Sequence, residues 1–145
     1  MPTEQSTDQT ITKPMEPSTI PPIARRARFR GALIDRLITI VQQLSRRESG
    51  ADHIIIIVVQ DGHFTYVPTL LRVKQGDTVE FRSHGSFEVM FKKQSPGDKL
   101  FLTDHDPILT IDKEAEYAVY HYAAAIQDGQ HVFLDSACGD IAVET

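Results

Sequence analysis

From residue 51 to its end, the chain is a series of short segments rich in β-branched and aromatic residues, separated by turn-forming residues. Such segments recur every 8 to 12 residues or so, and no helical pattern lies between them, which is typical of a β-sandwich of two sheets. The expected strands are 53–59, 63–67, 70–73, 78–83, 87–92, 108–111, 116–123, 131–134 and 140–144. The sequence therefore predicts an all-β domain over residues 51–145.

One of these segments predicts more than strand character. HIIIIVV (53–59) is apolar without interruption, so we expect a strand that is buried on both faces. Asp61 and Gly62 follow it, and Asp-Gly readily adopts the positive φ angles of a hairpin turn. In the other strands, period-two alternation predicts the inward-facing residues. These are Val79, Phe81, Val89, Phe91, Val119, Ile141 and Val143.

The N-terminal third has a different character. Residues 1–23 are rich in proline and polar residues, and this composition predicts a disordered tail. Over residues 24–49, apolar residues follow the three-and-four spacing of an amphipathic helix. Its apolar stripe consists of Leu33, Leu37, Ile40 and Leu44.

The stripe has two possible roles. It can pack on the sandwich, in which case the helix is structural. Alternatively it is an interaction surface that binds the groove of an unknown protein partner, mediates self-association, or lies on a membrane surface.

Charge is distributed unevenly. Residues 24–48 hold seven basic and two acidic residues, net +5, whereas residues 49–145 hold seven basic and fifteen acidic residues, net −8. An acidic body disfavours nucleic acid as a partner. The sequence has no transmembrane segment and no apolar signal-peptide core, and Cys138 is its single cysteine. Together these features predict a cytoplasmic protein.

The order of the strand signals resembles that of the cupredoxin family. The resemblance is carried by VKQGDTVEF (73–81), FEVMF (87–91), EYAVYHY (116–122) and CGDIAV (138–143), within residues 53–145. It implies a cupredoxin-like antiparallel Greek-key β-sandwich, here preceded by a disordered tail and one amphipathic α-helix.

In cupredoxins, copper is typically held by one histidine at the start of the second of these motifs, and by a cysteine, a second histidine and usually a methionine near the last loop. The resemblance places Phe87 at the first histidine, His121 at the cysteine and Ala137 at the methionine. It therefore implies that copper has been lost and that no cofactor is expected. The alternative is a copper-binding electron-transfer protein with a non-standard site, in which Cys138 pairs with His121 or His131.

Signatures of catalysis are lacking in the sequence. It contains no GxSxG nucleophile motif, no HExxH metal motif and no phosphate-binding glycine loop. We therefore expect a binding or interaction module rather than an enzyme.

Overall fold

The computed structural model describes residues 22–135 and 138–145. The chain divides into two compact units, residues 1–34 and residues 35–145. In the first unit, the described residues form the start of helix α1 (Pro22–Ser45). Proline suits the first turn of a helix because its missing N–H group has no intrahelical partner there. Except for Pro22 and Ile23, the tail predicted over residues 1–23 lies outside the described residues.

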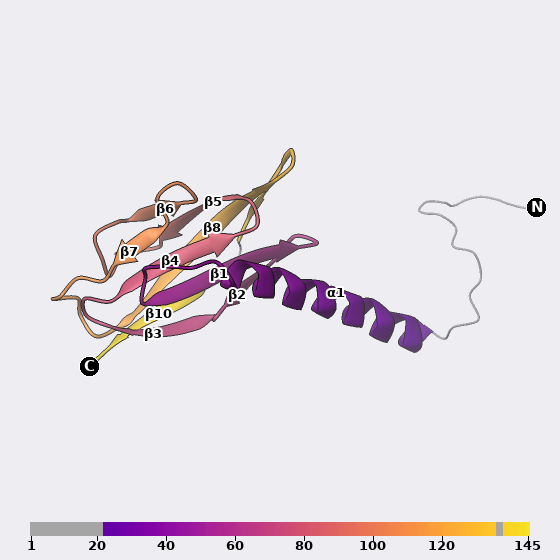
Figure 1. Ribbon diagram of the computed structural model, residues 1–145, viewed down its shortest axis with the longest axis horizontal. Helices are drawn as coiled ribbons and strands as arrows, with labels where there is room; N and C mark the ends of the chain where they lie inside the picture. Colours follow the sequence, from indigo (N-terminus) through magenta and orange to yellow (C-terminus); the bar gives the residue numbers. More distant parts are fainter. Residues whose placement is uncertain (1–21, 136–137) are drawn as a thin grey trace, which may run out of the picture. The chain divides into compact units, whose positions relative to one another are not determined.

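The second unit contains a sandwich of two β-sheets (Figure 1). Sheet A has the strand order β2-β1-β4-β7, and sheet B has the order β3-β10-β8-β5-β6, with β9 paired to β8. The strands are β1 (His53–Gln60), β2 (His63–Val67), β3 (Leu70–Lys74), β4 (Thr78–Ser83), β5 (Ser86–Phe91), β6 (Phe101–Thr103), β7 (Ile108–Thr110), β8 (Val119–Asp128), β9 (His131–Leu134) and β10 (Gly139–Glu144). The predicted β-sandwich of two sheets, preceded by a helix, is confirmed.

Two strand pairs are parallel, although the sequence predicted antiparallel sheets. They are β1 with β4 and β3 with β10, whereas the other pairings are antiparallel. The parallel pairs arise because the chain moves to the other sheet between β2 and β3 and again between β3 and β4. Strands that are distant in sequence thereby become neighbours, as expected of a Greek key.

The core lies between the sheets and confirms six of the seven predicted inward residues. The exception is Val119, which is 50% exposed. In β8 the buried side chains are those of Tyr120, Tyr122, Ala124 and Ile126. The predicted alternation of this strand was therefore wrong by one residue. Both faces of EYAVYHY carry aromatic or apolar residues, so periodicity alone does not select the inner face. As a consequence, His121 lies on the outer face of sheet B.

Strand β1 is buried on both faces, as predicted. Ile55, Ile57 and Val59 belong to the core between the sheets. Ile56 and Val58 face the other way and pack with the last turns of α1.

The packing partners of β1 include most of the predicted interaction stripe. Leu44 is buried against β1, and Leu37 and Ile40 are partly buried beside it. The fourth member, Leu33, lies outside the described side chains. The last turns of α1 therefore pack on the outer side of β1 in sheet A, and Leu37, Ile40 and Leu44 are engaged within the protein's own fold.

A buried arginine anchors this part of the helix. Arg82 on β4 is 3% exposed. Its Nη1 donates a hydrogen bond to the carbonyl of Leu44 at 2.7 Å, and its Nη2 donates one to the carbonyl of Glu48 at 3.1 Å. The last carbonyls of a helix have no intrahelical donor, so the guanidinium caps the C-terminal end of α1.

Arg82 also forms an ion pair with Glu80, from Nε to Oε2 at 3.0 Å. Burial acts to raise the pKa of Glu80, but hydrogen bonds from Arg82 and Ser49 outweigh it and leave this pKa below its usual value. The carboxylate is therefore held in its charged form beneath the helix end.

We expect acidification to weaken a contact that joins the start of β1 to the turn between β3 and β4. His53 Nε2 lies 2.8 Å from Asp77 Oδ2, which also accepts the Lys74 N–H group at 2.9 Å. These interactions, the first the larger, lower the pKa of Asp77 below its ordinary value. A lowered folded-state pKa contributes stability above the unfolded-state pKa, and this contribution is lost as pH falls through the folded-state value.

Urea unfolding at neutral pH and at successive values below about pH 4 tests this expectation. Asp77→Asn should be less stable than the parent at neutral pH, and the difference should shrink on acidification. Asp61→Asn, in an exposed turn, is the matched control. A constant difference between Asp77→Asn and the parent would contradict the assignment.

Among the described residues, no helix combines the length and apolar character needed to cross a membrane.

Candidate metal centre and exposed sheet face

The positions that the cupredoxin resemblance assigns to copper do not converge. Phe87 points into the core and is 7% exposed, whereas His121 lies on the outer face of the same sheet. In the pairing of β5 with β8, Phe87 lies opposite Ile126. Ile126 is five residues from His121, roughly 17 Å along a strand. Ala137 lies outside the described residues. Phe87 and His121 therefore do not fit a copper ion bound in the manner of the family.

His121 instead belongs to a different cluster of possible ligands, with Cys138 and Asp140. Antiparallel pairing of β8 with β10 places His121 directly opposite Asp140. Cys138 precedes Asp140 by two residues, the spacing that places side chains on one face of a strand. His121 Nδ1 lies 2.6 Å from Asp140 Oδ1, and Cys138 Sγ lies 3.7 Å from the same oxygen and 4.0 Å from Nδ1.

The residue between two of these ligands must be small. A Cβ atom on Gly139 would lie 2.3 Å from the ring of Tyr122, which is fully buried. The core thus requires glycine at this position, while Cys138 and Asp140 on either side of it reach the outer surface.

The thiol of Cys138 is partly buried. Burial raises its pKa, the negative charge of Asp140 raises it further, and the nearby charge of Lys92 acts in the opposite direction. The pKa of Cys138 is therefore above its ordinary value. Without a metal ion, the thiol is protonated at neutral pH. With the proton removed, the cluster offers one sulfur, one nitrogen and one oxygen donor.

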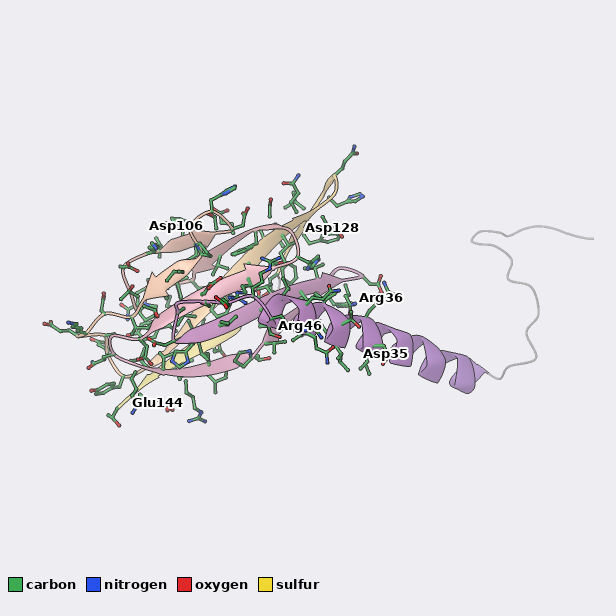
Figure 2. All side chains as sticks on the ribbon, in the orientation of Figure 1. Asp35, Arg36, Arg46, Asp106, Asp128 and Glu144 are labelled. Carbon is green, nitrogen blue, oxygen red and sulfur yellow. The ribbon has the colours of Figure 1, made fainter. Side chains whose placement is uncertain are left out.

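The second histidine predicted as a partner of Cys138 does not join this cluster. His131 begins β9 and lies opposite Asp128, beside the turn that joins β8 to β9. Asp128 is seven residues from His121 along β8, roughly 23 Å, and Figure 2 shows Asp128 at the opposite end of the sandwich from Glu144. Of the two pairings left open by the sequence, the structure forms the one between Cys138 and His121.

Asp140 was not predicted as a member of the site. The signal for it lay in the sequence Cys-Gly-Asp (138–140), because residues two apart in a strand share a face. Its contact with His121 depends on the register of β8 against β10, which the sequence alone does not specify.

The outer face of sheet B also carries an exposed apolar patch, which we call the sheet B patch. Met90 is 44% exposed, Phe101 49% and Leu134 75%. Strand pairing places Met90 between Phe101 and Ala123, and Leu134 beside Ala125. The two alanines leave a shallow depression of about 280 Å³, whose lining also includes Glu88 and Asp135.

Comparison with known proteins gives a likeness in fold. No family model matches the sequence, and no curated protein matches it. Two similar solved structures are the oxidised form of plastocyanin from Dryopteris crassirhizoma and a mutant plastocyanin of fern. Each match has 15% identity and a TM-score of 0.36, and covers 61% of this chain and 99% of the plastocyanin.

Proposed function

We propose that this protein is an interaction module of cupredoxin-like fold that has lost the copper site of the family. The observation that carries the proposal is a group of exposed apolar side chains on sheet B. Met90, Phe101 and Leu134 are exposed together there, whereas the outer side of β1 in sheet A packs with the last turns of α1. A contiguous apolar patch on a protein surface marks an interaction site more often than isolated apolar residues do.

The loss of copper is supported by the core position of Phe87 and by the outward position of His121. Addition of Cu(II) to the full chain tests it. An intense and stable thiolate-to-copper absorption band, with reversible one-electron reduction of the bound ion, would contradict the proposed loss of electron-transfer copper.

The occupant that we propose for the sheet B patch is the basic helical segment, residues 22–34, of a second copy. This segment contains four arginines and no acidic residue, together with Phe29, Leu33 and Ile34. Residues 35–145 contain ten basic and seventeen acidic residues. An apolar patch with Glu88 and Asp135 in its lining suits a helix that combines apolar and basic residues.

Light scattering of the full chain, over a range of concentrations and at low and high salt, tests this association. We expect the parent to form oligomers that weaken as salt rises, because surface charges are screened beyond about 8 to 10 Å at physiological ionic strength. Leu134→Glu should raise the dissociation constant at least about tenfold, which corresponds to roughly 1.4 kcal/mol. Replacing Arg25, Arg26, Arg28 and Arg30 together with glutamine should have a comparable effect.

Ile108→Glu is the matched control, because Ile108 is a partly exposed apolar residue of sheet A. It should associate like the parent. A parent that stays monomeric at all concentrations would contradict the proposed self-association. Oligomers that are lost in Leu134→Glu but kept in the arginine variant would instead indicate that two sheet B patches pack against each other.

A further inference from the structure

We propose that His121, Cys138 and Asp140 form a binding site for Zn²⁺ on the outer face of sheet B. The site shares His121 with the positions that the resemblance assigns to copper, but it excludes Phe87, which lies in the core, and adds Cys138 and Asp140. It is also independent of the proposed association through the sheet B patch.

The distances between the donor atoms are close to those that zinc requires. The three donors lie within 4.8 Å of one another. Zinc binds nitrogen and oxygen at about 2.0–2.2 Å and sulfur at about 2.3 Å, so tetrahedral ligands lie roughly 3.3–3.6 Å apart. Cys138 Sγ is already 3.7 Å from Asp140 Oδ1 and 4.0 Å from His121 Nδ1. The contact of His121 with Asp140, at 2.6 Å, needs to open by less than about 1 Å.

The backbone holds this arrangement in place. His121 and Asp140 are directly paired residues of neighbouring strands, in the middle of sheet B. Cys138 is fixed relative to Asp140 by Gly139, which packs against the ring of Tyr122. His121 and Asp140 are on strands, where ligands are positioned more accurately than on loops, and Cys138 immediately precedes β10.

The donor set favours zinc over other common metals. Magnesium and calcium prefer oxygen ligands only, whereas zinc accepts imidazole, thiolate and carboxylate together. Copper of the electron-transfer type needs two imidazoles with the thiolate, and the cluster contains one. Binding of Zn²⁺ replaces the thiol proton of Cys138, which passes to solvent. Three protein ligands leave a fourth position open to water.

Titration of the reduced full chain with Co²⁺, followed by displacement with Zn²⁺, tests the site. We expect a thiolate-to-cobalt charge-transfer band and tetrahedral cobalt absorption at one metal per chain, both of which disappear when zinc is added. Competition with a chromophoric chelator then gives the zinc affinity. Each of Cys138→Ser, His121→Gln and Asp140→Asn should weaken it by at least about tenfold, because even residues behind the ligands contribute 10- to 100-fold.

His131→Gln is the matched control and should bind zinc like the parent. Absence of a thiolate-to-cobalt band would overturn the proposal, and so would equal losses in His131→Gln and His121→Gln. A stoichiometry of one metal per two chains, with two thiolates on the ion, would overturn the proposal that the site is contained in one chain.

Repeating the titration in Leu134→Glu separates the zinc site from the proposed association, since that variant should lose association and still bind zinc. Melting curves recorded without metal verify that each variant is folded. If Asp140→Asn is unfolded, the zinc affinities of His121→Gln and Cys138→Ser test the proposal.

Discussion

Replacing Arg82 with methionine is expected to lower the free energy of unfolding by about 3 to 5 kcal/mol, the usual cost of removing one partner of a buried ion pair. The side chain is almost fully buried and bonds to Glu80 and to the carbonyls of Leu44 and Glu48. Methionine fills much of the same volume but donates no hydrogen bond. The carboxylate and both carbonyls would then lose their charged donor, and urea unfolding followed by circular dichroism measures the result.

Arg72→Met is the matched control for this prediction. Arg72 Nη1 also pairs with a carboxylate, Glu144 Oε2 at 2.7 Å, but both side chains are exposed. Exposed pairs contribute about 1 kcal/mol or less. Similar losses in Arg72→Met and Arg82→Met would show that the buried guanidinium does not anchor the helix.

Val79→Asp is expected to abolish folding. Val79 is fully buried in the core and pairs with residues of both β1 and β7 in sheet A. A carboxylate at this position must either be buried without a partner or be protonated, and both cost several kcal/mol. A domain of this size has a total stability of about 5–15 kcal/mol. Circular dichroism and the dispersion of amide resonances should therefore show an unfolded chain.

Val119→Asp makes the same chemical change at an exposed position. We expect its free energy of unfolding to lie within about 0.5 kcal/mol of the parent value. This comparison tests the alternation of β8 directly. If Val119→Asp also unfolds the protein, Val119 faces the core and His121 faces it as well, and the proposed zinc site is lost.

The features predicted correctly from the sequence depend on local pattern. The apolar run of β1 predicted burial on both faces, and Asp61 and Gly62 both have the positive φ expected of their turn, at 51° and 78°. Where the pattern was ambiguous, prediction failed. Aromatic and apolar residues on both faces of EYAVYHY concealed the alternation of β8, and β6 was not predicted.

The candidate site was predictable only in part, for a related reason. The absence of a histidine at Phe87 can be seen in the sequence, and so can the presence of Cys138 and His121. That His121 meets Asp140, and that Arg82 caps α1, both follow from contacts between residues far apart in the chain. Strand register and helix docking are set by the packing of the whole domain, so no local motif specifies them.

The cap that Arg82 places on α1 also affects how the helix forms. An isolated helix must first fix several residues for a single hydrogen bond, and this unfavourable nucleation limits short helices in water. In this protein, the turn that ends at Ser45 is already held by sheet A through Leu44 and Arg82. The nucleus is therefore supplied by the folded sandwich, and the helix extends from it toward Pro22 by propagation alone. A segment rich in arginine can thus be helical as the continuation of a turn that the sandwich already holds.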